Sequence, residues 1–447
     1  MNRERKHDAV RLRRVLMCAG PLLLAMSPGV WAQAQQEEGQ QASWGLDLGA
    51  RYTDNVGRVD TNEESDTVGI AGVNFAVDVN RPRFGARAAA DVRYQKYFDS
   101  TFDNDIQGGL DGTMSFAFVP QRLVWVVQDN YGQVSRNREV ADNPANLSDI
   151  NYFSTGPDLT LPFGARTSVQ LSGRWSDAYF EDAEQDSETL SGSAALVRQI
   201  SDAVALSLNG SYSEEDFDDD ALFVDYEVTQ AFLRLQLTGA RTSLSLDGGG
   251  SRVERKGATS KSEATLARLN LTRQVGTRSS LQLAVGTQPS NTSQTFRRDQ
   301  EFGGVEVGPD AAVVVGDSSQ ADYAYLTFTT NWVRSSLNFF ASARSEEHEV
   351  FSDFDRDQYR GTVTYSRDLT QSVTMDLRGT YLDEKFTNTG FAFDQWGAGV
   401  GMRWELGRSI SLRMRVDHFV GSSDDGTRDY TENRAYIGIG YSSNRGY

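Results

Sequence analysis

Residues 395–406 (QWGAGVGMRWEL) and 410–420 (ISLRMRVDHFV) decide the fold of this chain. In both stretches apolar and polar side chains alternate, so that one set lies on each face of a pleated strand. The short connection Gly407-Arg408 joins them and is typical of a tight hairpin turn. Together they predict an antiparallel hairpin with one apolar face and one charged face.

The same alternation continues from Trp44 to the end of the chain, and no stretch of it shows a sustained helical period. Nine short turns alternate strictly with ten longer, acid-rich connections. Nineteen connections predict about twenty strands, with roughly 18 to 22 compatible with the pattern. An even number of strands places both termini of the chain on the short-turn side, as in bacterial single-chain barrels.

Strand length and face chemistry favour a membrane barrel over a soluble all-β protein. The strands approach the roughly nine to eleven residues that cross a bilayer. Arg, Asp and Glu recur on the polar face, where a water-filled lumen tolerates them and a solid core does not. Aromatic residues gather near strand ends, as in Tyr94 to Phe98 and at Trp332, which is typical of interfacial girdles. We therefore expect residues 43–447 to form a transmembrane antiparallel up-and-down β-barrel, with short periplasmic turns and long acidic extracellular loops.

The N-terminus has the three-part layout of a secretory signal peptide. Six basic residues precede an apolar stretch from Val15 to Met26, and Val30 and Ala32 occupy the small-residue positions of a cleavage site. A single N-terminal anchor is the alternative, but the apolar stretch is short for a membrane span. We expect cleavage near Ala32, a polar lead-in over 33–42, and location in the outer membrane of a Gram-negative cell.

Composition narrows the function classes. The 44 basic and 62 acidic residues give a net charge of −18, and removal of 1–32 takes six basic and two acidic residues and leaves −22. Such acidity argues against nucleic-acid binding, which needs a basic face. Beyond residue 32 there are two histidines and no cysteine. We therefore expect no catalytic residues, no metal site built from His or Cys, and no cofactor.

The polar faces supply candidate residues for the wall of a pore. Rings of charge set pore selectivity, but both signs occur here, so no ion preference follows. Ion pairs that stiffen the wall are an equally good interpretation. The candidates are Arg174, Arg234, Arg268, Arg344, Arg378, Asp376, Arg403, Glu405, Arg413, Arg415 and Asp417.

The long connections raise two further questions. Acidic runs at 214–220, 181–188 and 346–357 could bind Ca²⁺, although a solvated rim fits their spacing better. We expect His348 to be solvated within such a run. The longest connection, 290–319, is predicted either to fold inward as a constriction or to form an extra hairpin above the membrane.

The chain resembles outer-membrane β-barrels of the porin type. Residues 52–58 (YTDNVGR) look like the opening of barrels found with exopolysaccharide and PEP-CTERM gene clusters, and the segments 143–146 and 156–157 are similar to them too. The resemblance implies a role in polysaccharide export or surface assembly. The last strand looks like the signal read by the barrel assembly machinery, with Gly438, Tyr441 and Tyr447 as candidates.

Two functions remain open at this point. The first is a porin-like channel that serves exopolysaccharide export. The second is a non-conducting surface barrel that acts as a scaffold, adhesin or assembly partner. Outer-membrane lipid, lipopolysaccharide, the assembly machinery and a polysaccharide are the expected partners.

Overall fold

The computed structural model describes residues 40–137, 140–181, 185–219, 223–257, 261–303, 315 and 317–443. The predicted signal peptide, most of the lead-in, and Tyr447 lie outside these residues. Among the described residues, no helix is both long enough and apolar enough to cross a membrane. Within the described ranges, one α-helix, α4 (Thr292–Gly303), and two 3-10 turns, η1 (Pro144–Asn146) and η3 (Ser352–Phe354), interrupt the strands.

Twenty strands follow one another along the chain. They are β1 (Gln40–Thr53), β2 (Asp66–Arg81), β3 (Phe84–Tyr97), β4 (Asp105–Val119), β5 (Leu123–Ser135), β6 (Leu147–Pro162), β7 (Thr167–Phe180), β8 (Ser187–Ser201), β9 (Val204–Phe217), β10 (Tyr226–Thr238), β11 (Thr242–Arg255), β12 (Lys261–Val275), β13 (Ser279–Ser290), β14 (Ser319–Asn331), β15 (Ser335–His348), β16 (Arg356–Asp368), β17 (Val373–Phe386), β18 (Ala392–Glu405), β19 (Ile410–Ser423) and β20 (Tyr430–Ser442).

The strands form one closed antiparallel barrel. Each strand pairs with its neighbours in sequence, and β1 pairs with β20 in a register that sets Gly49 opposite Gly438. Closure satisfies the backbone groups of every strand edge, which is the condition for a sheet in lipid. The predicted fold class and the predicted number of strands are therefore confirmed.

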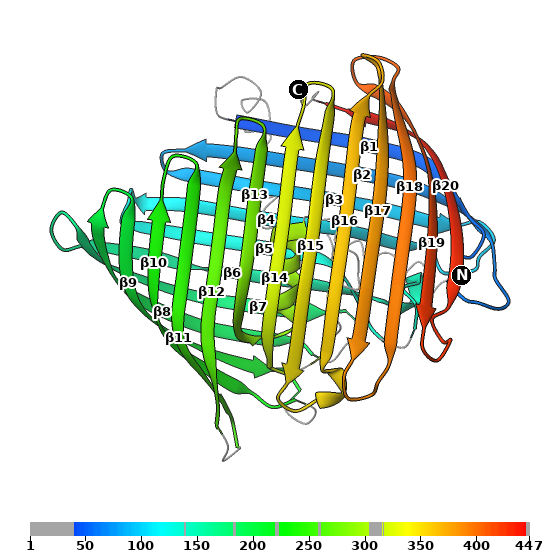
Figure 1. Cartoon of the computed structure of the whole chain (residues 1–447). Coiled ribbons are helices and arrows are strands. Elements are labelled where there is room, and N and C mark those ends of the chain that lie inside the picture. The colour runs from blue at the N-terminus through cyan, green and yellow to red at the C-terminus, as the bar shows by residue number, and fades with distance from the viewer. Residues whose placement is uncertain are drawn as a thin grey trace.

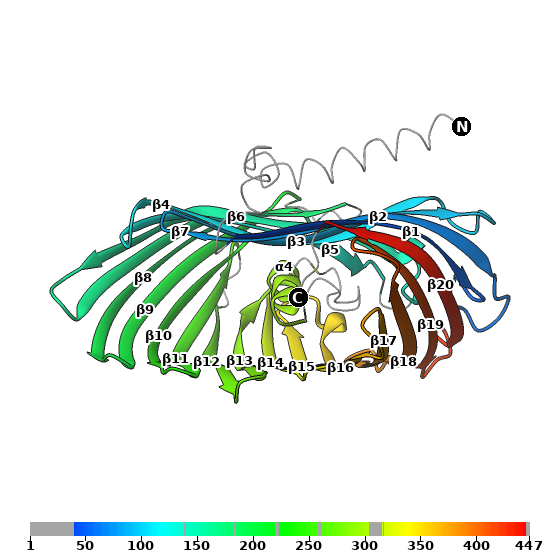
Figure 2. The same cartoon turned by 90° about the horizontal axis from the view of Figure 1, so that it is seen from above.

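The barrel is flattened. Figure 1 shows β1–β7 running across the back, and the strands from β9 to β18 running nearly upright in front of them. Viewed from above, these two groups form opposite walls, with α4 lying between them (Figure 2). Helix α4 is therefore placed between the two walls of the barrel.

The predicted alternation of connections is confirmed. All nine short turns lie at one end of the barrel, and the ten longer connections lie at the other. The strands are longer than expected, reaching 16 residues in β2 and β6. They exceed the roughly nine to eleven residues that a bilayer requires, so several polar residues expected in loops belong to strands.

The outer face carries an apolar belt. Leu48, Val416 and Ile437 are exposed on it, as expected of side chains that meet lipid. Near the short-turn end, the rings of Trp44 and Tyr441 lie 5.1 Å apart across the β1–β20 seam. Farther along the barrel, the ring centroids of Trp396 and His418 lie 5.2 Å apart. His418 therefore lies on the apolar side, as its place in the alternation predicts.

Candidate functional site

The inner face of the barrel carries the charged side chains. Arg403 alternates with exposed Trp404, and Arg415 and Asp417 flank exposed Val416. The same alternation places every predicted lumen residue on this face: Arg174, Arg234, Arg268, Arg344, Arg378, Asp376, Arg403, Glu405, Arg413, Arg415 and Asp417. Their part in a pore stays a prediction.

Several of these residues form ion pairs along the wall. Asp247 on β11 accepts from Arg234 at 2.7 Å and from Arg268 at 2.9 Å. Arg174 pairs with Asp158 at 2.7 Å. These pairs match the wall-stiffening alternative more closely than a ring of free charge.

Helix α4 folds into the lumen and reaches the far wall. Phe296 packs against Val134, Ile150 and Phe180, which lie on β5, β6 and β7. Its ring lies over Gly132, where a Cβ would come within 2.8 Å of it. Two amide contacts add to this anchor: Gln300 donates to the Tyr131 carbonyl at 3.0 Å and accepts from Asn130 at 3.0 Å. Of the two predictions for the connection 290–319, inward folding is the one that the described part of it follows.

A second set of contacts holds α4 to its own wall. Asp299 accepts from Arg344 at 3.0 Å and from the Tyr325 hydroxyl at 2.6 Å. Phe302 stacks on Tyr325 with ring centroids 5.1 Å apart. Because α4 touches both walls, it bridges the lumen.

The pair at α4 continues into a chain of buried charges, which we call the arginine–glutamate ladder. It runs Arg344, Glu346, Arg356, Glu384 and Arg428, with closest N···O distances of 3.3, 2.7, 2.7 and 3.8 Å in that order. Each of these side chains is no more than 5% exposed. Buried charges of this kind are strongly destabilising when one partner is lost, so the ladder fixes the long-loop end of the barrel.

The structure corrects two expectations about the acidic runs. His348 is the last residue of β15 and is largely buried beside Phe354, so the prediction that it is solvated is wrong. Glu346 and Glu215 were expected in solvated loops, but both are buried on strands. The strands extend farther toward the long loops than the sequence predicted, and their inward residues there meet α4 and its flanks: Glu215 accepts from Asn291 at 2.6 Å. Among the described residues, no group of three or more His, Cys, Asp or Glu side chains could hold a metal ion.

Residues 52–58 close the seam between the first and last strands. The Thr53 hydroxyl donates to Glu432 at 2.7 Å, and Arg58 pairs with the same carboxylate at 3.0 Å. Asp54 accepts from both the backbone and the side-chain nitrogen of Asn433. Burial acts to lower the pKa of Arg58, but Tyr430 and Glu432 outweigh it and hold that pKa above its usual value.

The connection between β5 and β6 also reaches this seam. Asn143 donates to the Gly57 carbonyl at 3.2 Å, and Ala141 packs among Leu382, Phe393 and Tyr430. Two of the three segments that carried the family resemblance, 52–58 and 143–146, are therefore in direct contact. In this structure these two segments close the β1–β20 seam and cover the long-loop end of the barrel.

The lumen differs between its two ends. Near the short turns, inward Arg87 and Asp78 have side chains 82% and 56% exposed. Toward the long loops, inward Glu432 is 2% exposed and Arg344 3%. The lumen is thus filled at the long-loop end and solvated at the short-turn end.

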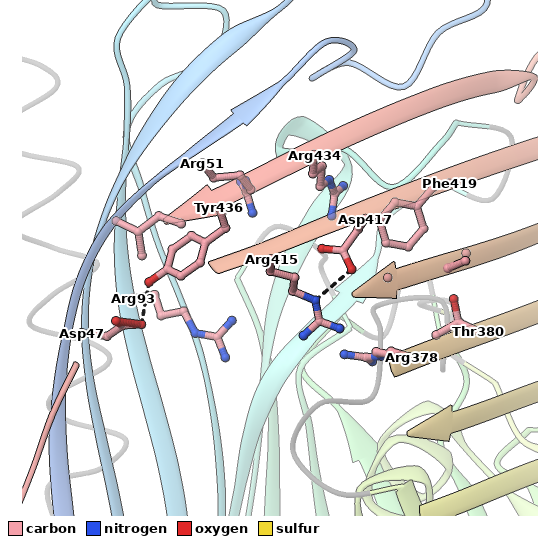
Figure 3. A pocket seen from close by; sticks show the side chains of 14 residues that line it. Asp47, Arg51, Arg93, Arg378, Thr380, Arg415, Asp417, Phe419, Arg434 and Tyr436 are labelled. Carbon is pink, nitrogen blue, oxygen red and sulfur yellow. Dashed lines mark hydrogen bonds and ion pairs between the residues drawn. The ribbon is translucent and has the colours of Figure 1, made fainter. Parts of the chain in front are cut away.

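An arginine-lined cavity of about 380 Å³ lies on the inner wall at the seam. Figure 3 shows its side chains converging from β1, β3, β17, β19 and β20. Three of the predicted lumen residues meet there: Arg378, Arg415 and Asp417. The sequence interpretation missed four others, Asp47, Arg51, Arg93 and Arg434. Their place opposite outward Leu46, Tyr52, Tyr94 and Ala435 in the strand alternation was the signal that could have found them.

Gly438 and Tyr441, the predicted assembly residues, face opposite sides of β20. Tyr441 is exposed outward beside Trp44. Gly438 lies under the Tyr436 ring, where a Cβ would come within 2.1 Å of the hydroxyl oxygen. A side chain at this position would therefore displace the Tyr436 ring, and the assembly role of both residues stays a prediction.

Comparison with known proteins places a family match on the last strands. The family model described as "Putative beta-barrel porin 2" matches residues 359–442, from β16 to β20. No curated protein matches the sequence. The resemblance to porin-type barrels is confirmed by this match, whereas the exopolysaccharide context stays a prediction.

Three proteins of Pseudomonas aeruginosa are among the solved structures of similar shape. A variant of the ferric enterobactin receptor PfeA is 8% identical, with 91% of this chain and 81% of that chain covered and a TM-score of 0.46. The siderophore receptor PirA is 10% identical, with 91% and 81% covered and a TM-score of 0.41. OccK2 (OpdF) is 9% identical, with 90% and 97% covered and a TM-score of 0.35. This chain is a closed twenty-stranded β-barrel whose last five strands match a porin-family model.

Proposed function

We propose that the protein is an outer-membrane channel whose lumen is narrowed at the long-loop end by α4. The observation that carries this is the pairing of an apolar outer belt with a charged inner face in a closed barrel. A closed sheet satisfies its backbone in lipid, and exposed inward charges such as Arg87 require a wetted lumen. The short turns then face the periplasm and the long loops face the outside.

The channel has a wide, solvated entrance and a narrow exit. A solute enters from the short-turn end, where inward side chains such as Arg87 are exposed. It next meets the arginine-lined cavity, and then α4 with the arginine–glutamate ladder. A 20-stranded wall would otherwise be wide, since 16 to 18 strands already leave an aqueous channel in porins. Conduction therefore depends on what α4 leaves open or on its displacement.

We further propose that the transported solute derives from an exopolysaccharide. The family resemblance of residues 52–58 and 143–146 supports this, although those residues serve the seam in the structure. Lipid and lipopolysaccharide would contact the outer belt, and the assembly machinery would read Gly438 and Tyr441. Cleavage near Ala32 would precede insertion.

A second candidate function is a non-conducting surface barrel. The bridge formed by α4 and the buried ladder favours it, because both hold the long-loop end shut. In this case the protein would act through its loops, as a scaffold or adhesin, and its lumen would conduct no solute.

Single-channel recording separates the two. The refolded chain without residues 1–32 is placed in planar bilayers, and its heat-modifiable gel shift reports that the barrel is folded. Steady openings support the channel. A folded barrel that stays silent across a range of voltages refutes the channel and leaves the surface barrel.

A further inference from the structure

The cavity at the seam has an unusual charge for this protein. Five arginines line it against two carboxylates, although the whole chain carries a net charge of −18. The arginines are Arg51, Arg93, Arg378, Arg415 and Arg434. Composition alone would place an acidic surface here, so the basic lining is a property of this site.

Ion pairs within the wall offset only part of this charge. Arg415 pairs with Asp417 at 2.8 Å, and Arg93 pairs with Asp91 at 2.7 Å. Arg434 shares Glu432 with Arg58. Arg51 donates to the neutral amide of Gln95 at 2.8 Å, and its Nε has no hydrogen-bond partner among the described residues.

Glycines on β18 make the room for the cavity. A Cβ on Gly399 would come within 2.0 Å of an Asp417 carboxylate oxygen, and one on Gly397 within 2.6 Å of both Phe419 and Thr380. Because these inward positions carry no side chain, the side chains of β17 and β19 can lie over β18, which forms the floor of the cavity. The carboxylate of Asp417 therefore lies over Gly399 of β18, where it accepts a hydrogen bond from Arg415 (Figure 3).

An aromatic side chain completes the lining. The Tyr436 hydroxyl donates to Asp47 at 2.9 Å, which fixes the ring beside the arginines (Figure 3). Guanidinium groups bind carboxylate and phosphate through paired hydrogen bonds, and aromatic rings offer a face to a sugar or other flat apolar surface. The cavity volume of about 380 Å³ is within the roughly 300–1,000 Å³ of small-molecule sites.

We infer that this cavity is a binding site for the oxyanion group of a sugar-sized solute, a carboxylate or a phosphate on a sugar ring. The inference deepens the proposed channel function, on which its transport meaning rests, by naming an anionic solute class. The solvated short-turn end gives the solute a path to the site. The site holds the anion before it meets α4.

The test measures binding to the folded barrel in detergent, so that it does not depend on conduction. Glucuronate, glucose 6-phosphate and glucose are titrated by calorimetry against wild type, Arg51→Gln and Arg378→Gln. Arg403→Gln is the matched control, because it removes an inward positive charge outside the cavity. Loss of one charge-assisted contact is expected to weaken binding by about tenfold.

The expected result is binding of at least one acidic sugar, no comparable binding of glucose, and about tenfold weakening in each cavity variant but not in Arg403→Gln. The preferred acid identifies the group as carboxylate or phosphate. Equal binding of glucose, no binding at all, or equal weakening by Arg403→Gln would overturn the inference. Failure of the channel proposal looks different: a silent barrel that still binds glucuronate refutes conduction alone, and a conducting barrel that binds no anion refutes this site alone.

Discussion

Replacing Phe296 with alanine should release α4 from the far wall and open the lumen. Phe296 is 4% exposed and packs on three strands of that wall, so its removal leaves a cavity that the rigid strands cannot fill. Truncation of a buried Phe costs about 3 kcal/mol or more. Since about 1.4 kcal/mol is tenfold, the ratio of docked to undocked α4 should fall by roughly a hundredfold.

Single-channel recording measures the effect as an increase in open probability, in mean conductance, or in both. Glu301→Ala is the control, because Glu301 is on the same helix and exposed. Gly132→Val tests the same contact from the wall, since a side chain there meets the Phe296 ring. If Phe296→Ala and Gly132→Val both conduct like wild type and Glu301→Ala while remaining folded, α4 does not limit the lumen.

Three further predictions concern the seam, the floor of the cavity and one loop. Glu432→Gln should lower the urea midpoint of unfolding by an amount equivalent to about 3 kcal/mol, because Arg58 loses its buried partner; an unchanged midpoint would show that this ion pair does not stabilise the seam. Gly399→Val should displace Asp417 and abolish anion binding while the gel shift persists. Retained binding would show that the glycines of β18 are not needed to form the site. Burial raises the pKa of Asp317, so its contribution to stability is lost as pH rises above the usual aspartate range. Wild type should therefore lose more thermal stability than Asp317→Asn between about pH 4 and about pH 7, and parallel curves would refute this.

The barrel could be predicted from sequence because its determinants are local. Alternation fixes which face each residue occupies, and Gly, Pro and Asn at the turns fix where each strand reverses. These rules identified all nine short turns and the inner face of β17 to β19. They act over a few residues, so no knowledge of distant contacts was needed.

The contents of the lumen could not be predicted in the same way. The sequence of α4, TSQTFRRDQEFG, is polar and has no apolar stripe at helical spacing. Its position depends on Phe296 and Asp299 meeting opposite walls, more than a hundred residues away for β5 to β7. Likewise, alternation places Glu346 inward but cannot tell that α4 covers it, so burial there was missed.

The uneven filling of the lumen favours a channel over a scaffold. A barrel that only displays loops gains from a lumen packed along its whole length, since inward charges are best held by partners in the wall. Here the buried ladder and α4 occupy one end, whereas Arg87 and Asp78 at the other end stay solvated. Between them lies a cavity lined by more arginines than carboxylates, even though several of these arginines have partners in the wall. A scaffold gains nothing from that basic lining, but a channel that draws an anion toward a narrow exit does.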